Sequence, residues 1–248
     1  MRPSPPALTD HALPKALLLD LDDTILDDTG RAAECWRDAC LAHQSDLGAV
    51  DPATLLEVIG RNRAHFWSDP ERHRVGRLDQ PVARREIVRT SLEALGVDAP
   101  SLAERIAEAY GSRRDRRIQP FAGAIETVRW LRENGCRLAL LTNGSGAAQR
   151  TKIDRFGLAD LFETILIEGE LGFGKPDARV YGLALDALGI EPFEAWMVGD
   201  NLEWDVAAPQ RLGIFGIWVD VRAAGLPPEH PVRPDRIVRR LAELRESR

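Results

Sequence analysis

The sequence predicts an α/β fold, with a doubly wound, Rossmann-like parallel sheet core that is interrupted by an inserted α-helical domain. Two observations predict it. From Pro120 onward, short apolar runs alternate with segments of helical spacing, which is typical of a parallel sheet with helices on both faces. One further apolar run, Ala16–Leu19, lies before a long segment that has helical spacing only. The first strand of the sheet is therefore separated from the second by a helical insertion.

The first strand consists of consecutive apolar residues that end at acidic residues. Such a run suits a strand that is buried on both faces of a parallel sheet. The chain before this strand begins with a proline-rich stretch, so we expect residues 1–13 to be a flexible N-terminal tail.

The inserted domain is predicted at residues 28–117, and the α/β core at residues 14–27 and 118–248. Within the insertion, apolar residues recur at helical spacing and strand-like runs are missing. Gly96 and Pro100 supply a stop signal and a restart signal between two of its helices.

After the insertion, strands and helices are expected to alternate. Pro209 lies inside the last predicted helix, so we expect it to kink that helix or to delay its start. The charged segment 239–248 is expected to be a solvated helix. The predicted strands are 137–141, 164–167, 195–198 and 215–219, and the predicted helices are 126–134, 147–156, 178–188 and 206–212.

The composition is that of a soluble globular protein, with a formal net charge of -6. This mild acidity argues against a nucleic-acid polymer as the partner. The sequence has no run of transmembrane length and no secretory signal at its start, so no membrane partner is expected. Three cysteines without metal-ligand or redox spacing favour reduced thiols and a cytoplasmic location. The sequence carries no signal for an oligomeric state.

Ligands of parallel α/β sheets bind at the carboxyl ends of the strands, so the residues just after each strand are the candidates for chemistry. Asp20 and Asp22 follow the first strand. Their spacing of two places both carboxylates on one side of an extended chain, where a cation or a shared proton relieves their repulsion. Such oxygen ligands suit Mg²⁺. The alternative interpretation is a solvated acidic turn.

The second junction is Thr142, Asn143 and Gly144, which offer a hydroxyl, a carboxamide and an accessible backbone N–H to a phosphate. These residues also suit an everyday turn.

The third junction contains Lys175. Residues 169–175 fit the start of a P-loop, but Pro176 occupies the position of the Mg²⁺-binding Ser or Thr, so we reject a P-loop. Pro176 and Asp177 are expected to start a helix. Lys175 would then stand just before that helix, where it could neutralise a carboxylate and a phosphate. The alternative is an exposed loop lysine.

The fourth junction contains Asp200 and Asp205, after the strand 195–198. Both would lie near the cation if this strand is a neighbour of the first strand. Alternatively, Asp205 is only an acidic residue at the start of a helix.

As an ordered set, these junctions resemble the motifs of the haloacid dehalogenase-like (HAD) hydrolase superfamily, subfamily I, of the phosphatase type. In that subfamily a helical cap domain is inserted between the first and second motifs, where the present chain has its insertion. The resemblance covers the core and is carried by its motifs. These are Asp20–Thr24, Leu141–Asn143, Lys175–Pro176, and Gly199–Asp200 with Asp205.

The resemblance implies roles for individual residues. Asp20 would be the nucleophile that forms an aspartyl-phosphate, and Asp22 would act first as general acid and then as general base. Thr142 and Lys175 would hold the phosphoryl group, with Asn143 and Gly144 as further substrate-binding residues.

The resemblance also implies a Mg²⁺ cofactor. Asp20, the backbone carbonyl of Asp22, and Asp200 would bind the ion, with Asp205 as a ligand or close beside it. Phosphoryl transfer needs a cation that screens negative charge, because a carboxylate has to approach a dianionic phosphate.

The sequence therefore predicts a Mg²⁺-dependent phosphatase that hydrolyses a small phosphorylated metabolite, a phosphomonoester. Sugar-phosphate mutases share all four motifs and stay open as an alternative. A 2-haloacid dehalogenase shares the nucleophile but needs neither Mg²⁺ nor the second aspartate, so Asp22 counts against it. A receiver-like phospho-accepting protein would carry its acceptor on the third strand, and a non-catalytic protein would lack motif residues. The substrate itself stays open.

Overall fold

The computed structural model describes residues 13–226 and 228–246 of the chain. The predicted N-terminal tail, residues 1–13, lies outside the described residues except for Leu13. The chain divides into two compact units. The helical unit is Asp28–Ile118, and the α/β unit comprises the chain up to Asp27 and from Gln119 onward.

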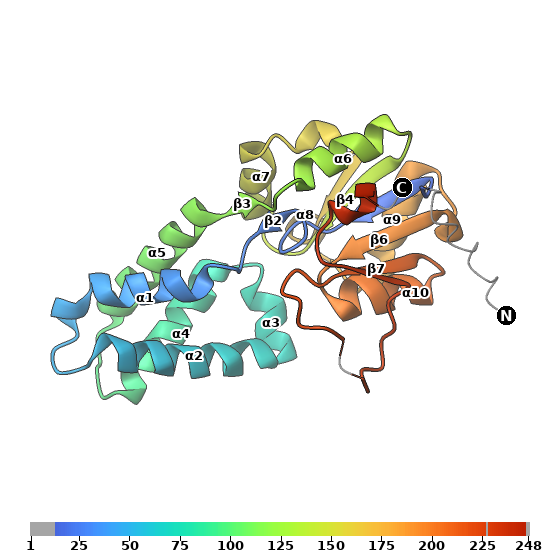
Figure 1. The fold of residues 1–248 in the computed structure, drawn as a ribbon. Helices are drawn as coiled ribbons and strands as arrows, with labels where there is room; N and C mark the ends of the chain where they lie inside the picture. Colours follow the sequence, from blue (N-terminus) through green and yellow to red (C-terminus); the bar gives the residue numbers. More distant parts are fainter. Residues whose placement is uncertain (1–12, 227, 247–248) are drawn as a thin grey trace. The chain divides into compact units, whose positions relative to one another are not determined.

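The α/β unit is built on a six-stranded sheet in which all neighbouring strands are parallel (Figure 1). The strand order is β5-β4-β1-β6-β7-β8, so β1 lies between β4 and β6. This arrangement confirms the predicted doubly wound α/β class. The strands are β1 (Ala16–Leu19), β4 (Arg137–Thr142), β5 (Thr164–Ile167), β6 (Ala195–Gly199), β7 (Phe215–Val219) and β8 (Arg236–Val238).

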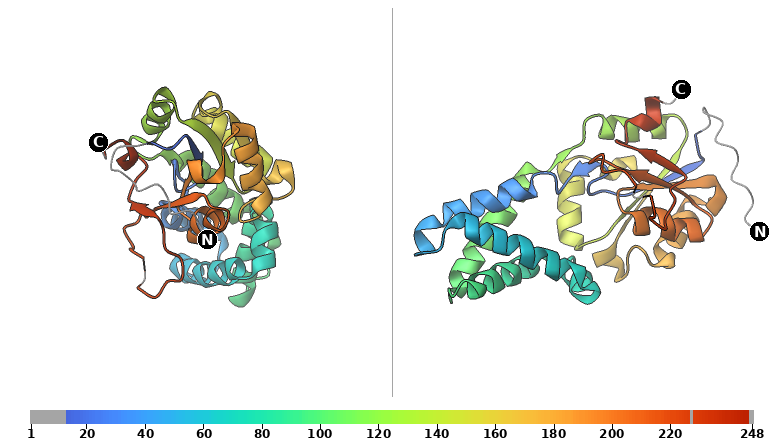
Figure 2. Two further views of the ribbon diagram at one scale, coloured as in Figure 1. Left: turned by 90° about the vertical axis from the view of Figure 1, so that its right-hand side faces the viewer. Right: turned by 60° about the horizontal axis from the view of Figure 1, so that its bottom comes forward.

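Helices cover both faces of this sheet (Figure 2). Alternate residues of the central strands, such as Ala16 and Leu18 of β1, pack against helix α9 (Ala178–Leu188) in one buried apolar cluster, as the period of two in a strand requires. The helices of the unit are α6 (Ala124–Glu133), α7 (Gly146–Arg155), α8 (Glu168–Leu171), α9 (Ala178–Leu188), α10 (Ala208–Arg211) and α11 (Glu243–Glu246), with the π-helix η4 (Leu202–Ala207) and the 3-10 turns η2 (Ala159–Leu161) and η3 (Pro192–Glu194).

The helical unit has its own buried core, to which its long helices contribute. Trp36 and Tyr110 stack there with ring centroids 3.7 Å apart. One helix ends just before Gly96 and the next begins at Pro100, as the stop and restart signals predict. The helices are α1 (Ala32–Ala42), α2 (Pro52–Ser68), α3 (Pro70–Gly76), α4 (Gln80–Ala94) and α5 (Pro100–Arg117), with the 3-10 turn η1 (Gln44–Asp46).

A small antiparallel ladder joins the two chain segments of the α/β unit, just before and just after the helical insertion in the sequence. Strand β2 (Leu26–Asp27) pairs with β3 (Gln119–Pro120), and the N–H of Phe121 donates to the carbonyl of Ile25 at 2.9 Å. Sequence patterns did not predict this ladder, because two residues are too few to show a period.

The C-terminal segment differs from the prediction. The predicted solvated helix over 239–248 follows strand β8, and in its described part only Glu243–Glu246 is helical, while Leu241 and Leu244 are buried. The segment contains so many charged residues that its sequence pattern does not reveal the few apolar residues that anchor it. Pro209 lies in the first turn of α10, which begins at Ala208 and directly follows the π-helix Leu202–Ala207, so the helical segment starts before residue 206 and only its α-helical part begins next to the proline.

Among the described residues, no helix combines the length and the apolar character that crossing a bilayer requires.

The buried C-terminal anchor leads to a stability prediction. Leu241→Ala should lower the free energy of unfolding by about 2 to 4 kcal/mol, because it leaves a cavity around a side chain that is 1% exposed. Ile237→Ala, in the same segment but 47% exposed, should cost less than about 1 kcal/mol. Urea unfolding of both variants measures the difference, and equal losses would contradict the buried position of Leu241.

Candidate active site

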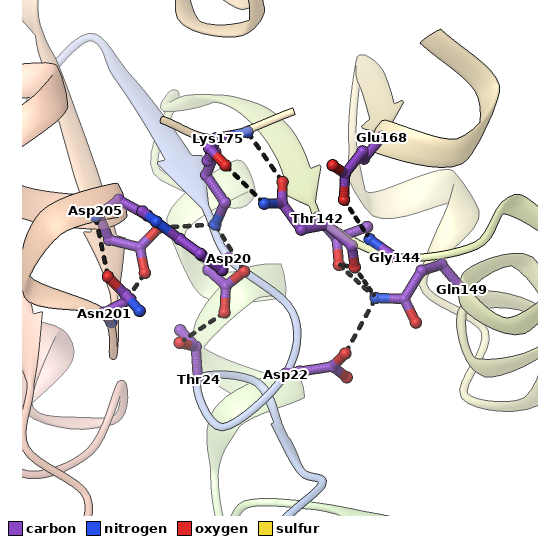
Figure 3. Close-up of polar contacts among 12 residues, drawn as sticks. Asp20, Asp22, Thr24, Thr142, Gly144, Gln149, Glu168, Lys175, Asn201 and Asp205 are labelled. Carbon is purple, nitrogen blue, oxygen red and sulfur yellow. Dashed lines mark hydrogen bonds and ion pairs between the residues drawn. The ribbon is translucent and has the colours of Figure 1, made fainter. Parts of the chain in front are cut away.

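The predicted chemical residues gather at the carboxyl ends of three neighbouring strands (Figure 3). Asp20 directly follows β1, Thr142 is the last residue of β4, and Asp200 directly follows β6. Because β1 lies between the other two strands, its aspartate can be reached by side chains from both sides.

Asp20 is held at both of its carboxylate oxygens. Lys175 Nζ lies 2.7 Å from Oδ1, and the Thr24 hydroxyl donates to Oδ2 at 3.1 Å. The residue is 7% exposed. These contacts leave the carboxylate in one orientation. Thr24 belongs to the motif Asp20–Thr24, but the sequence alone predicts no role for it.

Lys175 is a buried residue and not an exposed loop lysine, since it is 1% exposed. Its ammonium group contacts Asp205 Oδ1 at 2.6 Å as well as Asp20. Burial alone would lower the pKa of Lys175, but Asp20 and Asp205 outweigh this effect and raise that pKa above its ordinary value. Lys175 is therefore a fixed positive charge.

Asn143 holds the backbone of this lysine. Its carboxamide nitrogen donates to the Lys175 carbonyl at 2.7 Å, and its oxygen accepts from the Lys175 N–H at 2.9 Å. The close approach requires glycine at position 174, where a Cβ would lie 2.5 Å from the Asn143 oxygen. The structure thus uses for Lys175 the carboxamide that the sequence had assigned to the substrate.

Gly144 is also placed differently from the prediction. Its backbone N–H donates to Glu168 Oε2 at 3.0 Å, and Glu168 is 4% exposed. Its carbonyl accepts from the N–H of Gly169 at 3.0 Å. The turn after β4 therefore packs against Glu168 and Gly169, which directly follow β5, and its N–H has a protein partner in this structure.

Helix α9 spans the predicted range, Ala178–Leu188, but Pro176 and Asp177 lie just before it and not in its first turn. Asp177 is the N-cap of α9, and its side chain accepts from the backbone N–H of Arg179 at 2.9 Å. Pro176 precedes the cap. Lys175 still stands just before a helix, as the sequence indicated.

Asp205 is completely buried and lies in the π-helix η4. Its Oδ2 accepts from the backbone N–H of Asn201 at 3.0 Å. A Cβ at Gly199 would lie 2.3 Å from Asp205 Cγ, so only glycine at the end of β6 lets this carboxylate reach Lys175. Asp205 is thus more than an acidic residue at a helix start.

Asp20, Asp200 and Asp205 form a carboxylate cluster that could hold a metal ion. One oxygen from each lies within 4.8 Å of the other two. Burial raises the pKa of Asp20 to about 7, with Lys175 opposing the rise and Asp205 adding to it. Burial and the neighbouring Asp20 and Asp205 raise the pKa of Asp200 to about 8. Three acids with one lysine carry excess negative charge, which a divalent cation on hard oxygen ligands would compensate.

Asp22 has a different set of partners. Lys152 Nζ lies 2.7 Å from Oδ1 and 2.8 Å from Oδ2, and Gln149 Nε2 donates to Oδ2 at 2.9 Å. The Asp22 side chain is not part of the carboxylate cluster. Sequence analysis missed Lys152 and Gln149, because they lie inside a helix rather than at a strand end.

Comparisons with known proteins agree with this architecture. A family model described as haloacid dehalogenase-like hydrolase matches residues 14–213. A phosphoserine phosphatase of Thermus thermophilus is 38% identical, over 94% of this chain and 97% of its own length.

Solved structures are similar as well. A 2-haloacid dehalogenase from Pseudomonas syringae is 28% identical, with a TM-score of 0.61 over 95% of this chain and 98% of its own. A putative HAD-hydrolase from Bacillus subtilis, bound to magnesium, has the same fold, with a TM-score of 0.70 at 22% identity over 94% of this chain and 97% of its own.

The raised pKa values of Asp20 and Asp200 predict how pH affects stability. In metal-free protein these folded carboxyls keep protons that the unfolded chain has already released, so their contribution to stability falls as pH rises toward about 8. A divalent cation should reverse this loss. Thermal unfolding with and without magnesium chloride should show a larger stabilisation at about pH 8.5 than at about pH 6.

Asp200→Asn provides the control for that measurement. It removes one of the crowded charges, so the metal-free variant should be more stable than the parent protein above about pH 8 and should respond less to the cation. A cation effect of equal size at both pH values, or in both proteins, would contradict the assignment of this cluster.

Proposed function

The chain belongs to the haloacid dehalogenase-like hydrolase family and is a phosphatase of that family; we propose that it hydrolyses a small phosphomonoester with Mg²⁺ and through an aspartyl-phosphate on Asp20. One observation carries the proposal. A buried carboxylate, oriented at both oxygens, lies against a buried ammonium group and belongs to a cluster of three acids. The family resemblance that the motifs indicated is confirmed by the family match.

In the first half of the reaction, a carboxylate oxygen of Asp20 attacks the phosphorus atom and forms the aspartyl-phosphate. The bond between phosphorus and the ester oxygen breaks, and Asp22 donates its proton to the departing alcohol. The contacts from Lys175 and Thr24 support the role of Asp20, because they aim its carboxylate before substrate arrives.

In the second half, a water molecule attacks the phosphorus atom of the aspartyl-phosphate. Asp22, now a carboxylate, accepts a proton from that water. The bond between phosphorus and the Asp20 oxygen breaks, which releases inorganic phosphate and restores both aspartates.

Lys175 and Thr142 hold the phosphoryl group in this proposal. Lys175 is a fixed positive charge at 2.7 Å from the Asp20 oxygen. The oxygen of the Thr142 hydroxyl accepts from Gln149, and the proton of that hydroxyl has only a long contact of 3.5 Å with the Asn143 carbonyl. That proton can therefore turn to a phosphate oxygen.

The Mg²⁺ ion would be held by the carboxylates of Asp20 and Asp200 and by the backbone carbonyl of Asp22, with Asp205 beside it. When bound, it neutralises negative charge on the cluster and on the phosphate. The raised pKa values of Asp20 and Asp200 support this assignment, since they indicate that the buried carboxylates lack enough positive charge nearby to stabilise their ionised forms.

The helical unit is proposed to act as the cap of the enzyme and to determine which alcohol leaves. Its position in the chain, between the first and second motifs, supports this assignment. The three cysteines are free and buried, which suits a reducing compartment, and we place the enzyme in the cytoplasm.

The phosphatase proposal can be tested against the two other activities of the same fold. A panel of O-phosphoserine, sugar phosphates and nucleoside monophosphates should release inorganic phosphate in the presence of Mg²⁺. A sugar-phosphate mutase would instead return the phosphoryl group to a sugar. A dehalogenase would release halide from a 2-haloacid without Mg²⁺.

Asp20→Asn should abolish hydrolysis of p-nitrophenyl phosphate, because the carboxamide is a poor nucleophile. The expected loss in kcat is at least about 1000-fold, comparable to removal of a catalytic nucleophile. The matched control is Asp186→Asn, an exposed residue on α9, which should keep full activity. Robust turnover by the parent protein without Mg²⁺ would contradict the proposed metal dependence.

Trapping the intermediate tests the nucleophile separately. Beryllium fluoride mimics the phosphoryl group on an aspartate and should form a stable adduct with the parent protein in the presence of Mg²⁺. The ¹⁹F NMR signal of that adduct should be absent from Asp20→Asn and present in Asp186→Asn.

A further inference from the structure

The partners of Asp22 point to a role that the motifs do not assign. Lys152 lies on α7 and contacts both oxygens of the Asp22 carboxylate, at 2.7 and 2.8 Å. Lys152 is 8% exposed. A lysine usually keeps its ammonium group in water along the protein surface. Burying that group beside an acid is costly unless the pair has good geometry, and here both oxygens are engaged.

Gln149, one turn earlier on the same helix, is a second partner of Asp22 (Figure 3). It is 2% exposed. Its side-chain nitrogen lies 2.9 Å from Asp22 Oδ2 and 3.0 Å from the Asn143 carbonyl, and it also donates to the Thr142 hydroxyl. One carboxamide thus connects the proposed acid-base residue to the proposed phosphate-binding threonine.

The other cations of α7 serve different partners. Arg150 forms an ion pair with Glu170 at 2.7 Å, and both side chains are about 40% exposed. Arg155 lies over the ring of Phe156 at 4.9 Å. Position 152 is therefore distinguished on this helix by a buried contact with Asp22, and Arg150 offers a matched comparison.

Helix α7 is itself anchored to the turn that follows Thr142. Ser145 is its N-cap, and its side chain accepts from the backbone N–H of Ala148 at 3.3 Å. Only Gly144 separates this cap from Asn143. The helix that carries Gln149 and Lys152 therefore starts directly from the turn that follows Thr142, so these side chains have a defined position relative to it.

We propose that Lys152 and Gln149 are positioning residues. They hold the Asp22 carboxylate in one orientation and at a fixed position relative to the Thr142 hydroxyl. The proposal rests on the proposed function, since it concerns the proton transfers of Asp22. The Asp22 side chain is 28% exposed, so without these contacts it would sample several rotamers. Proton transfer to the leaving alcohol and from water requires the carboxyl to be within hydrogen-bond reach of both.

A double-mutant cycle separates this role from the alternatives. Lys152→Met keeps the length of the side chain and removes its charge. If Lys152 acts through Asp22, this change should lower kcat for p-nitrophenyl phosphate by about 10- to 100-fold and should change KM by less than about threefold. In an Asp22→Asn background, the same change should lower kcat by less than about twofold, because the group that Lys152 positions is already gone.

Three further variants complete the set. Lys152→Arg should restore much of the activity, since it can still contact both carboxylate oxygens. Gln149→Met should also lower kcat more when Asp22 is present than in the Asp22→Asn background, with a remaining loss through its contact with Thr142, and it keeps the test available if Lys152→Met does not fold. Arg150→Met, which removes an exposed positive charge from the same helix, should stay within about twofold of the parent kcat. Circular dichroism and thermal unfolding check that each variant is folded.

Each result decides the proposal. Equal losses from Lys152→Met in the presence and absence of Asp22, or a loss that appears mainly in KM, would overturn it and would make Lys152 a phosphate-binding or structural residue. Unchanged kcat in folded Lys152→Met and Gln149→Met would overturn it while leaving the proposed function intact. A parent protein that hydrolyses no phosphomonoester would overturn both the proposed function and the positioning role. The assay of the parent protein alone shows this, before any variant is measured.

Discussion

The ammonium group of Lys175, buried between the carboxylates of Asp20 and Asp205, is the interaction on which the rest of the site depends. Removing one partner from a buried set of charges leaves the others without compensation. The surrounding structure therefore has to hold all three groups in place. Because the cluster also contains Asp200, one lysine does not balance three carboxylates, and a divalent cation could compensate the remaining negative charge.

The ends of three strands hold these charged groups in place in different ways. The end of β4 supplies Asn143, which holds the backbone of Lys175 through two hydrogen bonds. The end of β6 supplies Gly199, whose missing Cβ makes room for the Asp205 carboxylate. The end of β1 supplies Asp20 itself, with Thr24 four residues later as its second contact. The central place of β1 in the sheet makes this convergence possible, since both neighbouring strands end at the same edge.

The sequence predicted most of the α/β unit, because its strands are apolar runs and its helices have a clear period. It missed elements that have no such pattern. The ladder of β2 and β3 has two residues on each side. Strand β8 and buried Leu241 lie in a segment dominated by charged residues. The sequence also predicted that Asn143 and Gly144 bind the substrate. A sequence does not show whether a carboxamide or an N–H in a turn already has a hydrogen-bond partner within the protein, as both groups have here.

The sequence by itself determined the α/β class, the position of the helical insertion, and the acidic, hydroxyl and lysine residues that follow the strands. These features are local, since each depends on residue types at short spacing. The tertiary structure decided which of these side chains meet and what each of them contacts. Lys175 became a buried partner of Asp20 and Asp205, and Asp22 was joined to Lys152 and Gln149, more than 120 positions away along the chain. Such contacts depend on the order of strands in the sheet and on the direction of a helix, which no local pattern records.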